Sequence, residues 1–417
     1  MKKLEVFGAN KLKGQIKISG SKNASLPILA ATLLSNKKIH LSNLPIVKDI
    51  ETMINLLQSL GSVTKYNKKI LTISNSKQNK KFASYNLVKT MRAGILVLGP
   101  LLAKFGQAKV SLPGGCAIGT RPIDIHLKAF SKLGVKYKID QGYVHAVAPK
   151  GLIGSKIKFP KISVGATENL IIASTLAKGI TILSNCAIEP EIKDLVNFLN
   201  KMGCNLKWLS KRTLKISGVK KLKETKYAIM FDRIEAGTYL IAAAITEGNL
   251  KIKNVKPNII QTEINTLKKI GSKIFIKKNE IHIIGKKRIK NINIKTAPYP
   301  GFPTDLQAQI MVLLSKANKR SLITEEIFEN RFMHVAELNR MGTRISIKGN
   351  KALIEGNTIF RPAELMATDL RASASLVLAA LAAKGKSQIN RIYHLDRGYE
   401  NIEKKLKKVG AKIRRIN

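Results

Sequence analysis

The chain has 417 residues and a formal net charge of +48, and 44% of its residues are hydrophobic. This length is typical of two or three domains, and the hydrophobic fraction is ample for globular cores. The longest apolar runs, such as residues 171–177, are far shorter than the ~20 residues that a membrane-spanning helix needs, so no membrane association is expected. Residues 1–8 lead directly into an alternating strand pattern, and we predict no signal peptide.

The positive charge is compatible with nucleic-acid binding. The lysines, however, are distributed along the whole chain, in pairs such as Lys268–Lys269, rather than gathered in one tail or stripe. Aromatic residues make up only 5% of the chain, which supplies a base-stacking surface poorly. We therefore attribute the charge to compositional drift and expect no nucleic-acid partner. The positive field should still attract small anions.

The chain has three cysteines, Cys116, Cys186 and Cys204. They are too few and too scattered for a disulfide framework or a metal site. They fit a reducing compartment, so we expect a cytoplasmic protein.

Six segments of the chain share one pattern, in which an apolar helix, a strand, a second helix and a further strand follow one another. The second helix of each segment ends in a glycine, and these glycines are about 70 residues apart. They are Gly61, Gly134, Gly203, Gly271, Gly342 and Gly410. A glycine in this place is typical of the left-handed residue that ends a helix. The first helices, for example residues 26–34, 237–244 and 372–380, are apolar on most faces and are predicted to be buried.

One such segment cannot cover both faces of its own sheet, so the segments must pack together. The simplest arrangement has three segments around a shared helical core, and this arrangement occurs twice. We therefore expect two similar lobes, and a cleft between such lobes is a natural ligand site.

Charged residues stand at the starts of the apolar helices. They are Lys22 with Asn23, Arg92, Asp232 with Glu235, Asp305, and Arg371. If the segments are equivalent, these side chains gather at one end of each lobe. A helix N-terminus with a lysine suits a phosphate, and Asp305 suits a general base. For any one of these residues alone, helix capping is the alternative.

Other residues are ambiguous from sequence. Arg397 lies on a glycine-containing loop, and its guanidinium suits a carboxylate or a phosphate. The alternative for this residue is a surface ion pair with Asp396 or Glu400. We interpret His126 as an ordinary loop histidine rather than a partner of the site residues, whereas both interpretations stay open for His334.

The most distinctive segment is residues 112–122, which read LPGGCAIGTRP. The glycines let the backbone approach a ligand closely, and Arg121 would favour the thiolate of Cys116. This combination indicates a mobile loop that carries a reactive thiol over an anionic substrate. A turn with a stray cysteine is the alternative.

Six motifs stand in order along the chain: SGSKNA (19–24), MRA (91–93), LPGGCAIGTRP (112–122), YPGFPTD (299–305), ENRF (329–332) and DLRA (369–372). Together they resemble the enolpyruvyl transferase family, in particular its UDP-N-acetylglucosamine 1-carboxyvinyltransferases, from about residue 4 to the C-terminus. The resemblance implies an α/β (α+β) fold, a two-lobed inside-out α/β barrel of six β-α-β-α-β-β repeats with three per lobe. One lobe would cover residues 22–230 with the Cys116 loop, and the other residues 1–21 plus 231–417.

The resemblance also implies the reaction. Enolpyruvyl would pass from phosphoenolpyruvate to the 3-hydroxyl of UDP-N-acetylglucosamine, with release of phosphate, by addition and elimination through a tetrahedral ketal. This is the first committed step of peptidoglycan synthesis. No cofactor or metal is implied, and we expect a monomer.

The family's functional residues match positions of this chain. The catalytic positions are Cys116 as proton donor, Asp305 as the base for the hydroxyl, Lys22, Arg397 and Asp369. The phosphoenolpyruvate positions are Lys22, Asn23, Cys116, Arg121, Arg371 and Arg397. The sugar-nucleotide positions are Asn23, Arg92, Arg121, Pro122, Ile123, Asp124, Ile125, Lys161, Ser163, Val164, Gly165, Asp305 and Ile327. The related enzymes that act on shikimate 3-phosphate lack the Pro-Gly-Gly-Cys loop, so they are the less favoured alternative.

Overall fold

The computed structural model describes residues 2–76, 80–89, 91–114 and 123–416. Within these residues the chain forms two compact units. Unit 1 comprises residues 2–19 and 231–416, and unit 2 comprises residues 20–114 and 123–230. In the part of the chain that is described, no helix is long and apolar enough to cross a membrane.

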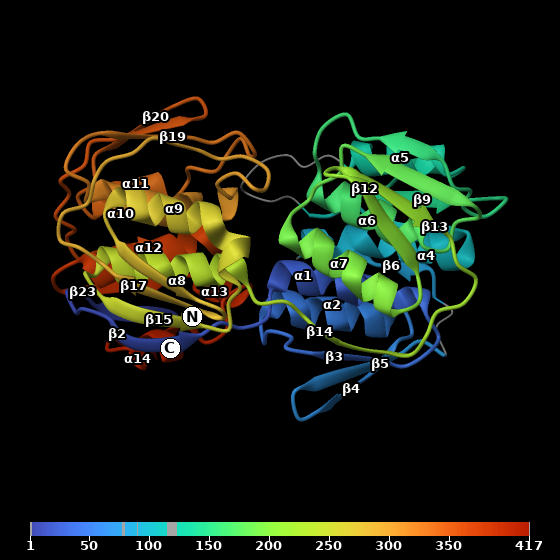
Figure 1. Cartoon of the computed structure of the whole chain (residues 1–417), viewed down its shortest axis with the longest axis horizontal. Helices are drawn as coiled ribbons and strands as arrows, with labels where there is room; N and C mark the ends of the chain where they lie inside the picture. Colours follow the sequence, from blue (N-terminus) through green and yellow to red (C-terminus); the bar gives the residue numbers. More distant parts are fainter. Residues whose placement is uncertain (1, 77–79, 90, 115–122, 417) are drawn as a thin grey trace. The chain divides into compact units, whose positions relative to one another are not determined.

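Unit 2, coloured blue through green in Figure 1, has three four-stranded sheets. Their strand orders are β14 (Thr225–Ala228), β3 (Ile39–Ser42), β5 (Ile70–Ser74), β4 (Val63–Asn67); β6 (Phe82–Ala83), β7 (Gln107–Ser111), β9 (Tyr143–Val147), β8 (Lys136–Asp140); and β10 (Lys156–Lys158), β11 (Ile180–Ser184), β13 (Thr213–Ser217), β12 (Asn205–Ser210). In each sheet the first pair is parallel and the remaining pairs are antiparallel. The three sheets therefore share one topology.

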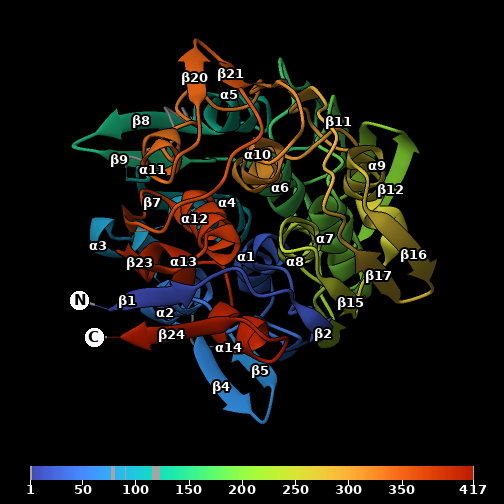
Figure 2. The same ribbon diagram turned by 90° about the vertical axis from the view of Figure 1, so that its left-hand side faces the viewer.

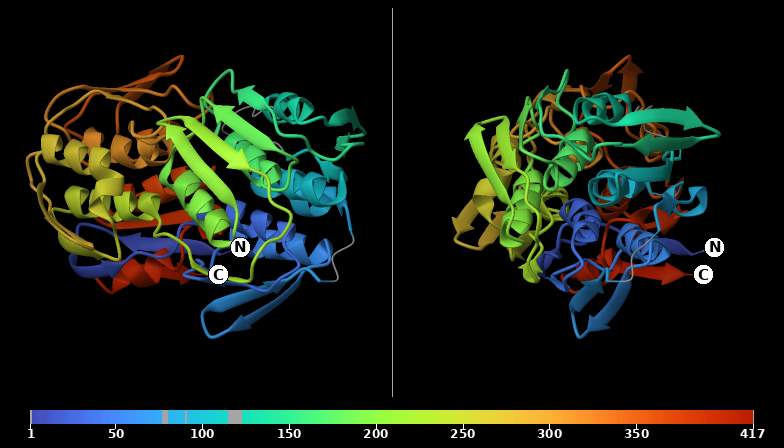
Figure 3. Two further views of the ribbon diagram at one scale, coloured as in Figure 1. Left: turned by 45° about the vertical axis from the view of Figure 1, so that its right-hand side comes forward. Right: turned by 90° about the vertical axis from the view of Figure 1, so that its right-hand side faces the viewer.

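Helices fill the middle of unit 2, as Figure 3 (right) shows. The central helices are α1 (Lys22–Ala31), α4 (Leu98–Phe105) and α6 (Val164–Ser174), and the outer ones are α2 (Lys48–Ser59), α5 (Asp124–Lys132) and α7 (Pro190–Lys201). Short helices are η1 (Thr32–Leu34), α3 (Tyr85–Val88) and η2 (Arg92–Val97). Helix α6 is buried from Ala166 to Ser174, which is what an apolar surface on every face requires.

Unit 1 repeats this architecture. Its sheets have the orders β16 (Lys273–Lys277), β17 (Glu280–Ile284), β15 (Asn249–Lys253), β2 (Lys13–Lys17); β18 (Ile294–Lys295), β19 (Ser321–Thr324), β21 (Lys351–Ile354), β20 (Ile345–Lys348); and β22 (Glu364–Met366), β23 (Lys386–Asn390), β1 (Lys3–Phe7), β24 (Lys412–Ile416). Its central helices are α8 (Arg233–Ile245), α10 (Gln307–Ser315) and α12 (Leu370–Ala382). The other helices are η3 (Pro257–Ile260), α9 (Gln261–Ile270), η4 (Thr304–Leu306), α11 (Val335–Arg340), α13 (Tyr393–Asp396) and α14 (Ile402–Lys407).

Within unit 1 the helices lie inside and the sheets outside. Figure 2 looks at this unit and shows α8, α10 and α12 surrounded by the strands of its sheets. All 13 residues of α8 are buried. The predicted fold class is confirmed: the chain is an α/β protein of six β-α-β-α-β-β repeats, three in each unit, with the helices innermost.

The six repeat glycines adopt the conformation expected of them. Gly61, Gly134, Gly203, Gly271, Gly342 and Gly410 all have positive φ angles, between 88° and 117°. Residues other than glycine rarely take such angles, so a glycine in each repeat lets the outer helix stop and the next strand begin.

The two N-terminal strands, β1 and β2, both belong to sheets of unit 1. Strand β1 pairs antiparallel with β23 and β24, so it supplies the last strand of the sixth repeat. Strand β2 precedes α1 but pairs with β15, whereas β14 precedes α8 but pairs with β3. Among the described residues, the chain therefore passes between the units after Ser19 and after Met230.

The two connections are held beside each other by backbone hydrogen bonds. The N–H of Ser21 donates to the carbonyl of Met230 at 2.7 Å, and the N–H of Asp232 donates to the carbonyl of Ser19 at 2.9 Å. Gly20 lies in the first connection, and a Cβ there would come within 1.6 Å of the Asn43 carbonyl oxygen. Only glycine fits at this point, immediately before the start of α1.

Candidate active site

The strongest candidate site in unit 1 is the carboxylate of Asp305 in η4. Arg331 Nη2 donates to its Oδ1, and Arg371 Nη2 donates to its Oδ2, each at 2.8 Å. The arginine side chains are only 4% and 5% exposed, and that of Asp305 is 26% exposed. Each oxygen of this carboxylate is therefore held by one guanidinium group, which fixes its orientation. Helix capping is not its role, because Leu306 is the N-cap of α10.

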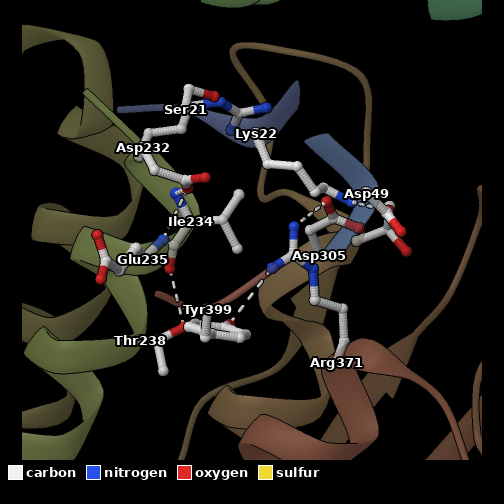
Figure 4. Close-up of polar contacts among 12 residues, drawn as sticks. Ser21, Lys22, Asp49, Asp232, Ile234, Glu235, Thr238, Asp305, Arg371 and Tyr399 are labelled. Carbon is white, nitrogen blue, oxygen red and sulfur yellow. Dashed lines mark hydrogen bonds and ion pairs between the residues drawn. The ribbon is translucent and has the colours of Figure 1, made fainter. Parts of the chain in front are cut away.

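Arg371 is the second residue of the buried helix α12, and Figure 4 shows its side chain reaching Asp305. Burial is the largest single influence on the pKa of this guanidinium and would lower it, but the charges of Asp305, Tyr399 and Asp232, with the hydrogen bond to Asp305, together leave the pKa raised. Asp369 is the N-cap of the same helix, where its Oδ1 accepts from the N–H groups of Arg371 at 2.8 Å and Ala372 at 3.2 Å. One oxygen of this predicted proton-transfer residue is thus fixed at the helix terminus.

Arg397 directly follows α13 and is partly buried. The two acidic residues that the sequence offered as alternative partners have other contacts. Asp396 accepts from Arg415 through both carboxylate oxygens, at 2.5 and 2.9 Å. Glu400 accepts from the hydroxyl of Ser19 at 2.7 Å.

The loop with Ile327 is tied to the turn with Asp305. Glu325 Oε1 accepts from the backbone N–H groups of Ile327 at 2.9 Å and Phe328 at 3.1 Å. Its Oε2 accepts from the hydroxyl of Thr304, the residue before Asp305, at 3.0 Å. This carboxylate therefore places two predicted sugar-nucleotide positions relative to each other.

In unit 2, Lys22 and Asn23 are the first residues of α1. The hydroxyl of Ser21 caps this helix by accepting from the N–H of Ala24 at 3.2 Å. Lys22 Nζ lies 3.3 Å from Asp49 Oδ2, and their side chains are 12% and 6% exposed (Figure 4). A lysine at a helix N-terminus opposes the helix dipole, and the charge of Asp49 compensates for part of that cost.

A second predicted ligand stretch begins α6. Ser163 caps the helix by accepting from the N–H of Ala166 at 3.3 Å. Val164 is exposed and Gly165 follows it. A Cβ at Gly165 would lie 3.4 Å from the ring of His126, so the ring packs directly beneath this glycine.

His126 is a buried residue of α5, so its interpretation as a loop histidine is wrong. Burial lowers its pKa to about 4, and the ring is neutral at pH 7. The amide oxygen of Asn169 accepts from the N–H of Gly99 at 2.8 Å, which leaves its Nδ2 to donate to His126 Nδ1 at 3.2 Å. The ring proton is therefore assigned to Nε2. His334 is also buried, and burial lowers its pKa to about 4.

The remaining predicted positions lie as follows. Ile123 and Ile125 have buried side chains at the start of α5, Asp124 between them is exposed, and Lys161 is exposed. Arg92 is the first residue of η2. Cys116, Arg121 and Pro122 lie outside the described residues.

Sequence reasoning missed a buried polar cluster beside the first connection. Ser19 N–H donates to Glu235 Oε2 at 2.8 Å, and Lys405 Nζ donates to Glu235 Oε1 at 2.5 Å and to the hydroxyl of Ser19 at 2.6 Å. Burial raises the pKa of Glu235 to about 7 even though Lys405 opposes the effect. Its position at the start of an apolar helix was the only sequence signal. Arg331 was likewise visible only as part of a motif.

The sequence is similar to a family model and to curated proteins over nearly the whole chain. The family model for EPSP synthase (3-phosphoshikimate 1-carboxyvinyltransferase) matches residues 6–406. A UDP-N-acetylglucosamine 1-carboxyvinyltransferase from Pelagibacter ubique is 81% identical over 417 residues, which cover 100% of both chains. An enzyme with the same name from Geotalea uraniireducens is 50% identical over 416 residues, again covering 100% of both.

Solved structures give the same fold. The enolpyruvyl transferase NikO from Streptomyces tendae matches with a TM-score of 0.90 and 23% identity, over 99% of this chain and 98% of that one. An EPSP synthase from Acinetobacter baumannii matches with a TM-score of 0.77 and 18% identity, over 100% of both chains. At these sequence identities the similarity to the two structures shows only that the fold is shared.

Proposed function

Because this chain belongs to the enolpyruvyl transferase family, and within it to the UDP-N-acetylglucosamine 1-carboxyvinyltransferases, we propose that it makes enolpyruvyl-UDP-N-acetylglucosamine. The donor is phosphoenolpyruvate, the acceptor is the 3-hydroxyl of the sugar, and phosphate is released. This is the first committed step of peptidoglycan synthesis. The structural observation that supports the proposal most directly is the carboxylate of Asp305 between two buried guanidinium groups.

The reaction requires one proton acceptor and one proton donor. In the addition step Asp305 takes the proton of the sugar hydroxyl while the oxygen bonds to C2 of phosphoenolpyruvate. Cys116 gives a proton to the methylene carbon, which yields a tetrahedral phospho-ketal. In the elimination step the C–O bond to phosphate breaks and the new methyl group loses a proton, with Asp369 assisting. Correctly placed acid–base groups typically contribute ~10²–10⁴-fold each.

The substrate is anionic at both ends, so it calls for several cations. We assign the carboxylate of phosphoenolpyruvate to Arg371 and Arg397, and its phosphate to Lys22, Arg121 and Arg397. A guanidinium forms two parallel hydrogen bonds to a carboxylate, which fixes the orientation of the substrate as well as binding it.

The sugar-nucleotide positions stay as predicted from the family. They are Asn23, Arg92, Arg121, Pro122, Ile123, Asp124, Ile125, Lys161, Ser163, Val164, Gly165, Asp305 and Ile327. The buried side chains of Ile123 and Ile125 suggest that these two act through their backbone groups. We further propose a cytoplasmic monomer whose lobes are residues 22–230 and residues 1–21 plus 231–417.

A phosphate-release assay with phosphoenolpyruvate and each of two acceptors tests this function. UDP-N-acetylglucosamine should support release and shikimate 3-phosphate should not. The family model is named for the shikimate enzyme, so release with shikimate 3-phosphate alone would reverse the assignment. The variant Cys116→Ser should lose most of the activity, because serine is a far weaker acid than cysteine.

A further inference from the structure

Tyr399 occupies a position in unit 1 where it contacts all three central helices. Its side chain is 2% exposed. Its hydroxyl lies within hydrogen-bonding distance of Thr238 on α8, Gln309 on α10 and Arg371 on α12. A buried phenol needs polar partners, and here each partner comes from a different helix. Figure 4 shows Tyr399 with two of them, Thr238 and Arg371.

The donors and acceptors around this hydroxyl form one consistent chain. Arg371 Nη1 at 3.4 Å and Gln309 Nε2 at 3.1 Å can only donate, so the phenol oxygen accepts from both. The phenol proton is then directed to the hydroxyl oxygen of Thr238 at 2.8 Å. The Thr238 hydroxyl in turn donates to the backbone carbonyl of Ile234 at 2.8 Å. The chain therefore ends on the rigid backbone of α8.

The ring of Tyr399 makes a second contact with the same arginine. Arg371 Cζ lies 5.6 Å from the ring centroid, within the range of a cation–π interaction. The guanidinium is therefore held by an aromatic ring as well as by the carboxylate of Asp305. Gln309 extends the network, because its Nε2 also donates to the backbone carbonyl of Asp305 at 3.0 Å.

We propose that Tyr399 is a positioning residue for the transfer reaction, and that its ring and hydroxyl fix the guanidinium of Arg371 in the orientation in which it bonds Asp305. The inference rests on the proposed function, in which Arg371 binds the carboxylate of phosphoenolpyruvate. Arginine recognises a carboxylate through a planar fork of donors, so a reoriented guanidinium loses affinity for that group first.

Three variants separate this role from simple packing. Tyr399→Phe keeps the ring and removes the hydroxyl, whereas Tyr399→Leu removes both. Tyr239→Phe is the matched control, because Tyr239 is equally buried on α8 and its hydroxyl has no hydrogen-bond partner among the described residues. Tyr399→Phe should raise KM for phosphoenolpyruvate about 3- to 10-fold, the effect of one ordinary hydrogen bond, with KM for the sugar nucleotide changed less than about 2-fold. Tyr399→Leu should raise it further, and the control should match the wild type.

A readout independent of activity follows the arginine itself. In ¹⁵N NMR spectra the guanidinium of Arg371, assigned by its loss in Arg371→Lys, should rotate slowly in the wild type and in Tyr239→Phe, and faster in Tyr399→Phe. Failure of the wild type to release phosphate would refute the proposed function. The rotation rate of the Arg371 guanidinium in the ¹⁵N spectra would then decide whether Tyr399 positions it. An unchanged guanidinium signal, or an active Tyr399→Phe enzyme with a lower Tm but an unchanged KM for phosphoenolpyruvate, would overturn the inference.

Discussion

The variant Glu235→Gln should change how the stability of the protein depends on pH. Burial raises the pKa of Glu235 to about 7 from an ordinary value of 4.5. The native chain therefore holds this proton more tightly than the unfolded chain does. The stability that the proton contributes is fully present below pH 4.5 and is lost as pH rises through 7. The gap between the two pKa values corresponds to about 3 kcal/mol.

Glutamine cannot ionise, yet its amide oxygen can still accept a hydrogen bond from Lys405 or from the N–H of Ser19. The free energy of unfolding of Glu235→Gln, relative to the wild type, should therefore rise by about 3 kcal/mol between pH 4.5 and pH 8. Urea unfolding at several pH values measures this difference. Glu326→Gln is the control, because Glu326 forms an exposed ion pair with Lys295 and such pairs contribute little. Parallel stability curves for the wild type and Glu235→Gln would refute the reasoning.

Three further predictions concern single side chains. Ser21→Ala removes the cap of α1 and should lower the free energy of unfolding by about 1 kcal/mol, seen as a lower Tm, whereas Ser21→Asp should not. Asp305→Asn removes the proton acceptor and should slow phosphate release about 10²–10⁴-fold, and near-normal rates would exclude it as the base. Fosfomycin with the sugar nucleotide should modify Cys116 in mass spectra but not Cys186 or Cys204, because burial raises the pKa of both to about 12. Unmodified Cys116 would contradict the reactive-thiol assignment.

The repeat architecture could be predicted because its signals are local and occur six times. A glycine that follows a helix with one apolar stripe, as Gly271 follows α9, predicts a residue of positive φ that ends the helix. This prediction holds in each repeat. A helix that is apolar on every face, such as α8, is likewise predicted to be buried from its sequence alone. The pairing of β2 with β15 and of β14 with β3 could not be predicted in the same way. Strands whose residues are over 180 positions apart leave no local pattern that shows their pairing.

The candidate site was only partly visible in the sequence. Asp305 and Arg371 attracted notice through their motifs, but their mutual hydrogen bond and the second arginine, Arg331, depend on three segments meeting in space. Tyr399 carries no sequence signal, since a tyrosine after a glycine reads as an ordinary loop residue. His126 was misjudged because a nearby proline and glycines suggested a loop, whereas the described residues from Asp124 onward form a helix.

The most direct measurement is the structure of the product. Phosphoenolpyruvate and UDP-N-acetylglucosamine are incubated with the enzyme, and the product is analysed by mass spectrometry and NMR. We predict one enolpyruvyl ether on the 3-hydroxyl of the sugar, formed in equal amount with phosphate. A sugar nucleotide recovered unchanged, or an enolpyruvyl group found only on shikimate 3-phosphate when that acceptor is supplied, would contradict the proposed function.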